Sequence, residues 1–302
     1  MNSSWWEINV RCHPSLEDTV YWRTEQFGCR GTSSESKGPV QVISAYLPQE
    51  QAHLLDLSAL ALWLKQDAIV SELPVPIVRW RIIDEEDWSS SWKDHWEPQD
   101  IGDRFAIYPA WIEAPPGLAR QVLRLDPGVA FGTGAHATTQ LCLESVEMRL
   151  TGEPTEKVVV DIGCGSGILA LGALLLGAKK AYCVDIDPLA VRAACQNRSL
   201  NGLTEAQMVV EQGSLETLSQ LIDGPIDGFF CNILAEIVSE MIPHFARIAK
   251  PTTWGIVSGV LIEQSKPIAD LFEQHGWIVA TLWKRKEWCL SLIHISEPTR
   301  PY

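Results

Sequence analysis

Three glycines that follow a short apolar run are the residues of this chain best suited to binding chemistry. The β-branched run Val158–Ile162, which includes Asp161, predicts a buried strand, and Gly163, Gly165 and Gly167 come directly after it. A helical pattern follows the last glycine. Because glycine has no Cβ, such a loop can turn sharply and approach a ligand closely. This order predicts a nucleoside cofactor site, although a plain strand-to-helix turn would use the same glycines.

An acidic residue at the end of the next predicted strand fits the same ligand. Residues 181–184 are apolar, and Asp185 follows them. A carboxylate at this place can accept hydrogen bonds from two ribose hydroxyls. Dinucleotide-binding folds use Gly-x-Gly-x-x-Gly, whereas this loop is Gly-x-Gly-x-Gly. The shorter spacing resembles motif I of the S-adenosylmethionine-dependent methyltransferases that have a seven-stranded sheet, whose cofactor has no phosphate to bind.

A second loop, rich in glycine and threonine, lies upstream in the sequence FGTGAHATT. It includes Phe131, Thr133, His136 and Thr139, and a helix is predicted to begin near Thr138. Taken alone, such a loop is equally a turn followed by a helix N-cap. In a doubly wound sheet it could instead fold over the carboxyl ends of the strands, where ligands bind.

A third candidate is Asn232, at the end of the predicted strand 226–231. Asparagine at a strand end is commonly a turn former. Many amine methyltransferases place an asparagine or aspartate here, and its side-chain carbonyl holds the amine that is methylated. The position therefore predicts an N-methyl acceptor.

Four motifs, FGTGAHATT, DIGCGSGILA, DIDP and NILA, occur in an order and spacing that resemble the bacterial ribosomal protein L11 methyltransferases. The resemblance runs from Trp5 to about Leu290 and includes Glu287-Trp288-Cys289. It implies an enzyme that transfers methyl groups from S-adenosylmethionine to lysine ε-amino and N-terminal α-amino nitrogens of ribosomal protein L11. It implies that Thr139, Gly163, Asp185 and Asn232 contact the cofactor, and that Phe131, Thr133 and His136 belong to a mobile loop that covers it. Asp161 and Gly165 of the glycine motif are further candidates for cofactor binding.

Methyl transfer to an amine is an in-line displacement, so the protein's main task is to align the acceptor nitrogen, the methyl carbon and sulfur. The amine must be neutral to react, and a desolvated pocket beside a sulfonium would lower its pKa. We expect Asn232 to position the acceptor amine. His136 is a weaker candidate for a general base, and deprotonation by bulk water stays open.

The elements that must position these residues predict an α/β protein with two domains. Residues 101–290 predict a doubly wound, seven-stranded Rossmann-like methyltransferase domain. Residues 1–97 predict a small α+β, ferredoxin-like substrate-recognition domain with strands at 5–10, 40–47 and 77–83 and helices at 16–26 and 49–66. An acidic, aromatic linker is expected over 84–110, with Trp88, Trp92 and Trp96 on one face of a short helix.

The charge and cysteine content of the chain bear on which partners and ligands it binds. A net charge of −14 opposes a protein whose main contact is nucleic acid and favours a basic protein partner, although an acidic balance also serves solubility alone. The eight cysteines form no Cys-x-x-Cys pair, so neither disulfides nor a metal site is expected. We expect a cytoplasmic monomer without a membrane-spanning segment.

Two alternatives from other classes stay open. One is an S-adenosylmethionine-dependent N-methyltransferase of another protein, a small molecule or RNA, and the other is a cofactor-binding module without catalysis. The last residues, 291–302, depart from the resembling family, and Pro298 and Pro301 would end any strand by Ser296. We expect this segment to be a non-native tail.

Overall fold

The computed structural model describes residues 4–84, 97–126, 134, 136–150 and 152–295. The chain divides into two compact units, 1–97 and 98–302. The expected tryptophan stripe of the linker, together with Phe131 and Thr133 of the upstream loop, lies outside the described residues. No helix in the described ranges is both long and apolar enough to cross a membrane.

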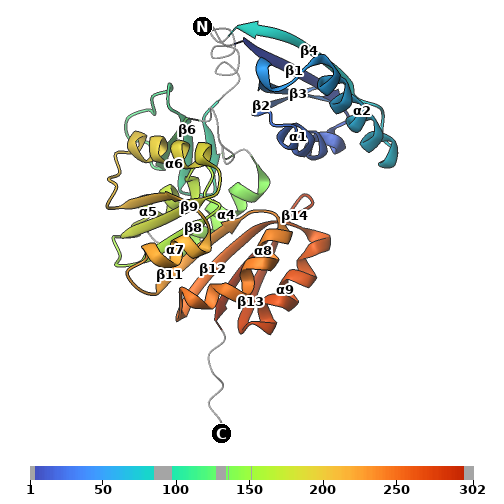
Figure 1. The fold of residues 1–302 in the computed structure, drawn as a ribbon. Coiled ribbons are helices and arrows are strands. Elements are labelled where there is room, and N and C mark those ends of the chain that lie inside the picture. The colour runs from blue at the N-terminus through green and yellow to red at the C-terminus, as the bar shows by residue number, and fades with distance from the viewer. Residues whose placement is uncertain (1–3, 85–96, 127–133, 135, 151, 296–302) are drawn as a thin grey trace. The chain divides into compact units, whose positions relative to one another are not determined.

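The N-terminal unit is a four-stranded antiparallel sheet in the order β2-β3-β1-β4 (Figure 1). Its elements are β1 Ser4–Cys12, α1 Glu17–Gln26, β2 Arg30–Lys37, β3 Val40–Pro48, α2 Leu54–Val70 and β4 Ile77–Asp84. One apolar core joins the strands to both helices, with Ile8 and Ile43 from the sheet and Leu60 and Leu64 from α2. The two helices cover one face of this sheet.

Two elements of this unit differ from the sequence prediction. The helix expected from Gln49 begins instead at Leu54, because Ala52 is extended and the backbone N–H of His53 donates to Asp56 Oδ2 at 2.7 Å, capping the helix there. Strand β2 was not predicted. Its sequence, RGTSSESK, has no apolar alternation, and it lies at the sheet edge where one side pairs with β3.

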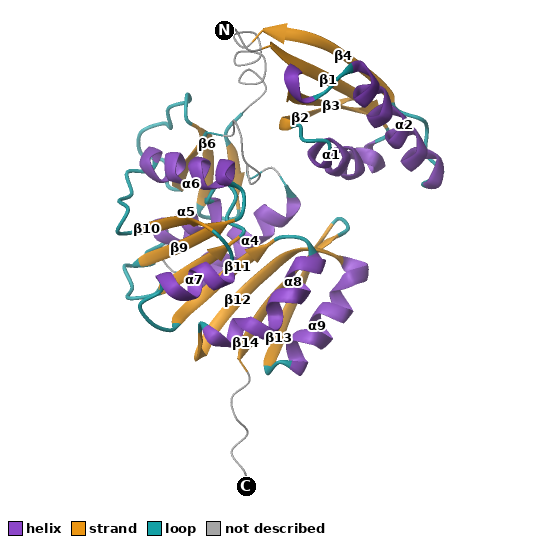
Figure 2. Ribbon diagram, viewed as in Figure 1, coloured by secondary structure: helices purple, strands orange, loops and turns teal. Residues whose placement is uncertain are grey.

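The second unit is built on a seven-stranded sheet in the order β10-β9-β8-β11-β12-β14-β13. Its strands are β8 Val158–Ile162, β9 Lys180–Asp185, β10 Met208–Gln212, β11 Ile226–Asn232, β12 Ala249–Leu261, β13 Trp277–Arg285 and β14 Trp288–Ile295. The first five strands of this order pair in parallel, and β14 pairs antiparallel with both β12 and β13. The unit is thus a mixed α/β fold with a large, mostly parallel sheet (Figure 2).

Helices cover both faces of this sheet. They are α4 Ala137–Arg149, α5 Ile168–Leu175, α6 Pro188–Leu200, α7 Leu215–Leu221, α8 Ala235–Met241 and α9 Ser265–Gln274. One core packs α4, α5 and α6 on one face, and a second core packs α7, α8, α9 and the 3₁₀ helix η4 (Ile242–Arg247) on the other. Alternate strand residues enter opposite cores, as Val159 and Val160 do in β8.

The ends of this unit also depart from expectation. Residues 99–109, assigned to the linker, form β5 Gln99–Ile101 and β6 Phe105–Pro109, which join β7 Gln121–Leu125 in a three-stranded sheet. At the other end, β14 continues five residues past the expected boundary at 290, because its apolar alternation lets Leu292 and Ile293 enter the two cores. Residues 296–302 lie outside the described residues, and the non-native origin of 291–302 stays a prediction.

Candidate functional site

The glycine loop lies at the carboxyl end of β8, where the strand order reverses between β9 on one side and β11 on the other. Crevices at such switch points bind ligands in open α/β sheets. Gly163, Gly165 and Gly167 all have positive φ, at 69°, 54° and 79°, a backbone region that favours glycine. A Cβ on Gly163 would lie 2.5 Å from Ile233 Cγ2, so the loops after β8 and β11 meet closely.

Asp185 ties the glycine loop to the end of β9. Its Oδ2 accepts the backbone N–H of Gly165 at 2.8 Å, and its Oδ1 accepts that of Asp187 at 3.0 Å. The carboxylate is therefore held by two backbone donors from two loops. Each oxygen keeps a lone pair for a further donor, such as a hydroxyl.

Asp161 lies beneath this loop and is almost fully buried, at 1% exposure. Its Oδ2 accepts the backbone N–H of Ala170 in α5 at 3.2 Å. Burial raises the pKa of Asp161 to about 8, with a smaller contribution from the nearby charge of Asp185, while the Ala170 hydrogen bond opposes the shift. Asp161 therefore links β8 to the first turn of α5.

The upstream loop reaches the same edge. Gly134 has φ +88°, and a Cβ there would collide with Ile107 and lie 3.4 Å from Ile168, the first residue of α5. His136 is the N-cap of α4, where its Nδ1 accepts the backbone N–H of Thr138 at 3.3 Å and lies 2.7 Å from the Thr138 hydroxyl. Because Nδ1 is the acceptor of the cap, the ring proton is assigned to Nε2.

The environment of His136 keeps its ring neutral. Burial lowers the pKa of His136 to about 4, the charge of Lys286 lowers it further, and Glu287 opposes the shift. Its ring packs edge-on against Trp288, with 5.1 Å between ring centroids. The ring is weakly basic and its Nδ1 lone pair accepts the cap hydrogen bond, so the geometry favours the capping role over the general base.

Three buried polar atoms at this edge have no hydrogen-bond partner among the described residues: Thr139 Oγ1 in α4, Asn232 Oδ1 in β11 and Trp288 Nε1 in β14. Buried polar groups are normally paired, so each such exception calls for an explanation. Asn232 pairs with Ser258 of β12, and Ser258 contacts Cys142, one turn along α4 from Thr139. These unpaired atoms thus belong to elements that pack together.

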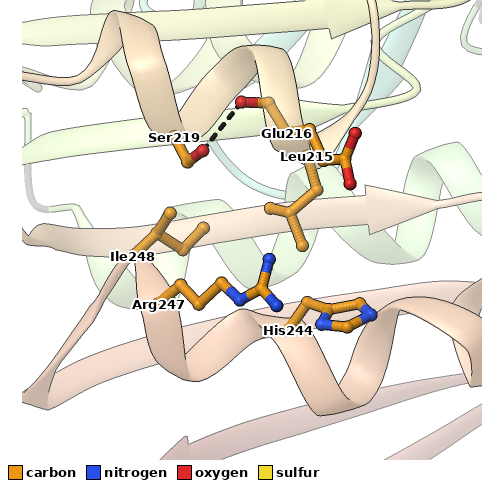
Figure 3. Close-up of a pocket in the computed structure, with 6 residues that line it drawn as sticks. All are labelled: Leu215, Glu216, Ser219, His244, Arg247 and Ile248. Atoms are coloured by element: carbon orange, nitrogen blue, oxygen red, sulfur yellow. Dashed lines mark hydrogen bonds between the residues drawn. The ribbon is translucent and has the colours of Figure 1, made fainter.

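A separate small cavity lies on the other face of the sheet (Figure 3). It has about 30 Å³ of space, and its described lining consists of Leu215, Glu216, Ser219, His244, Arg247 and Ile248, none of them a predicted site residue. Ser219 donates to the Glu216 carbonyl oxygen at 2.7 Å within it. A cavity of this size holds a water molecule or two, so it is not a cofactor site.

The family assignment rests on the whole chain. A family model described as ribosomal protein L11 methyltransferase (PrmA) matches residues 4–295. The chain belongs to this family.

Relatives in the L11 methyltransferase family are similar over nearly the full length. A Cyanothece protein of that name is 51% identical over 297 residues, covering 97% of this chain and 99% of the relative, and one from Thermosynechococcus vestitus is 46% identical, covering 96% of each. A solved structure, the ribosomal protein L11 methylase of Lactobacillus delbrueckii subsp. bulgaricus, has a TM-score of 0.60 at 30% identity. It covers 67% of this chain and all of that one. The protein is therefore a methyltransferase.

Two groups of predicted residues gather at this edge of the L11 methyltransferase fold. Gly163, Gly165 and Asp185 form one group, and Thr139, Asn232 and His136 the other, joined by the contact of Gly163 with Ile233. Among the described residues no cluster of three or more His, Cys, Asp or Glu side chains could hold a metal ion. Sequence reasoning gave Trp288 no role, because only the pairing of β14 with β12 brings it here.

Proposed function

We propose that this protein transfers methyl groups from S-adenosylmethionine to lysine ε-amino and N-terminal α-amino nitrogens of ribosomal protein L11. The observation that carries the proposal is the buried, unpartnered Oδ1 of Asn232, at the end of β11 and beside the glycine loop. A carbonyl acceptor left unpaired in a buried site is stabilised when an amine donates to it. The names of the relatives support ribosomal protein L11 as the source of that amine.

The residues present fit S-adenosylmethionine. Asp185, already fixed by two backbone N–H groups, would accept from the ribose hydroxyls, and the glycine loop would approach the nucleoside. The buried hydroxyl of Thr139 supplies one more unpaired polar group. When bound, the cofactor would supply an electrophilic methyl group on a sulfonium.

Asn232 would orient the acceptor without holding its proton. A neutral amide oxygen accepts one N–H of the amine and leaves the nitrogen lone pair to face the methyl group, whereas a carboxylate would stabilise the unreactive ammonium form. His136, neutral and committed to the α4 cap, would shape the pocket wall. The acceptor would then lose its proton to water before or during its entry into the site.

The substrate proposal is tested by incubating the protein with methyl-labelled S-adenosylmethionine and purified ribosomal protein L11, then mapping the label by mass spectrometry. We expect label on lysine or α-amino nitrogens and a large loss of label in Asn232→Ala. Gln220→Ala is the matched control, because Gln220 is an exposed amide in α7, on the other face of the sheet. Cofactor binding without label on the protein would refute the substrate.

The cofactor proposal has its own test in calorimetric binding of S-adenosylhomocysteine. Asp185→Asn should weaken binding about tenfold or more, because hydrogen bonds to a charged acceptor contribute about 1.5–3 kcal/mol. Asp187→Asn removes a neighbouring charge while keeping a good N-cap for α6, so it should bind as the unmodified protein does. Equal binding by Asp185→Asn would refute the ribose contact.

We also propose that the N-terminal unit is a ferredoxin-like substrate reader. The β2-β3-β1-β4 order with both helices on one core supports the fold class. An aromatic patch supports the reading role: the Arg23 guanidinium lies 4.7 Å from the Trp22 ring and 5.9 Å from the Trp63 ring, and it pairs with Asp67 at 2.6 Å. Both rings are nearly half exposed, as suits protein-contact anchors.

The patch is tested by Trp63→Ala. We expect KM for ribosomal protein L11 to rise several-fold, while the affinity for S-adenosylhomocysteine stays unchanged. Met148→Ala, which truncates an exposed apolar side chain in the other unit, is the control. An unchanged KM in both Trp22→Ala and Trp63→Ala would remove this patch from recognition.

We propose a cytoplasmic monomer without direct nucleic-acid binding, supported by the net charge of −14 and by the ribosomal protein in the relatives' names. Light scattering on the purified protein checks the mass against 33.6 kDa. A mass of twice that value would refute the monomer.

A further inference from the structure

The indole of Trp288 lies at the edge of the sheet that carries the proposed site. Trp288 is the first residue of β14 and pairs with Leu261 of β12, while Asn232 pairs with Ser258 on the opposite side of β12. Two strand spacings, roughly 10 Å, therefore separate the backbones of β11 and β14, and the two residues also lie three positions apart along β12. The two side chains do not hydrogen-bond each other, so each buried polar atom is left for a ligand.

Strand alternation places both side chains on the same face. In β11, Phe230 enters the core that holds α4, so Asn232, two residues on, points to that face. In β14, Leu290 enters the same core, so Trp288 points there too. The edge-on contact of Trp288 with His136, the N-cap of α4, agrees with this direction.

The indole Nε1 of Trp288 is buried without a hydrogen-bond partner among the described residues. Indole N–H groups donate only, and when buried they usually find an acceptor. Asn232 Oδ1 is the complementary atom, a buried acceptor without a hydrogen-bond donor among the described residues. A buried donor and a buried acceptor on the same face of the sheet match a ligand that carries both kinds of group.

We propose that the Trp288 N–H donates to a carboxylate or carbonyl oxygen of the ligand bound beside Asn232. The oxygen belongs either to the amino-acid moiety of the cofactor or to the peptide backbone of the methyl acceptor. This inference rests on the proposed function, and it makes Trp288 a binding residue. The ring of Trp288 packs edge-on against His136, the N-cap of α4, on that face of the sheet.

The test follows the indole N–H directly in proton–nitrogen spectra of the full-length, nitrogen-15-labelled protein. Trp288→Phe keeps an aromatic ring against His136 and identifies the Trp288 signal by its loss. A downfield shift of that signal on addition of S-adenosylhomocysteine assigns the oxygen to the cofactor. A shift that appears only when ribosomal protein L11 is added as well assigns it to the acceptor. A signal that moves with neither addition overturns the proposal.

Binding measurements give an independent readout. Trp288→Phe should weaken S-adenosylhomocysteine binding, or raise KM for ribosomal protein L11, about three- to tenfold, as expected for one hydrogen bond. Trp254→Phe is the control, because Trp254 is a buried indole in the middle of β12, paired with Gly228 near the amino end of β11. If the unmodified protein binds S-adenosylhomocysteine and the Trp288 signal stays fixed throughout, the inference alone fails. If that ligand does not bind at all, the proposed function fails with it.

Discussion

The guanidinium group of Arg285, at the end of β13, donates through Nη2 to both carboxylate oxygens of Glu144 in α4, at 3.1 and 2.9 Å. Its Nη1 donates to Gln140 Oε1 at 3.2 Å, one turn earlier in the same helix. Arg285 also pairs with Trp288 across the β13–β14 hairpin. The hairpin that carries Trp288 is therefore clamped to the helix that carries Thr139.

This clamp predicts a measurable coupling energy. Both side chains are about a third exposed, so solvent screening limits the pair to about 0.5–1 kcal/mol of unfolding free energy. A double-mutant cycle of Arg285→Met and Glu144→Gln in urea unfolding should return a coupling of that size. The exposed i,i+4 pair of Lys266 and Asp270 in α9 is the control, expected to show a smaller coupling. Equal couplings for both pairs would refute the clamp.

Gly163→Ala should damage the cofactor loop more than its backbone strain alone explains. Gly163 and Gly202 have nearly equal φ, 69° and 67°, but a Cβ meets Ile233 at 2.5 Å in the first case and open space in the second. We expect Gly202→Ala to cost about 1 kcal/mol and Gly163→Ala more, with loss of S-adenosylhomocysteine binding only in Gly163→Ala. Thermal melting and calorimetry measure the two effects. Equal behaviour of the two variants would mean that the loop tolerates a Cβ.

His136 should make stability depend on pH on the acid side. Because burial lowers the pKa of His136 to about 4, the unfolded chain binds a proton between pH 6.5 and 4 that the folded protein does not bind. Folding free energy contributed by His136 is therefore lost as pH falls through this window. His136→Asn keeps an N-cap residue. When pH falls from 7 to 5, the unfolding free energy of this variant, measured in urea, should rise by about 1–2 kcal/mol relative to that of the unmodified protein. A constant difference would show that His136 titrates normally.

Asp161 should give the protein a pH dependence of stability opposite to that from His136. Burial raises the pKa of Asp161 to about 8, so the folded protein retains a proton that the unfolded chain has lost above about pH 4. Stability from this group is full below pH 4 and falls as pH rises to 8, by at most about 1.4 kcal/mol per pH unit. The unfolding free energy of Asp161→Asn should therefore rise relative to that of the unmodified protein as pH increases from 5 to 8. A parallel pH dependence of the two proteins would place the pKa near its ordinary value.

Elements with strong local signals were predictable from the sequence. The β-branched run before Gly163 and the helix from Ile168 appear within two residues of their expected bounds, because strand, glycine turn and helix propensities agree there. Strand β2 carries no such signal. It forms because β3 offers a free edge, and that edge exists only in the folded sheet.

The sequence by itself determined the family and the strand, glycine loop and helix of the cofactor motif, and it predicted residues that could bind a nucleoside and an amine. Motif spacing encodes these features locally, since each motif joins one strand to the loop after it. Only the tertiary structure decided which of these side chains lie on the same face at the same edge of the sheet. Asn232 and Trp288 are far apart in the chain, and they face the same helix because β12 lies between their strands and pairs with both. Strand order and register are properties of the whole sheet, and no segment specifies them alone.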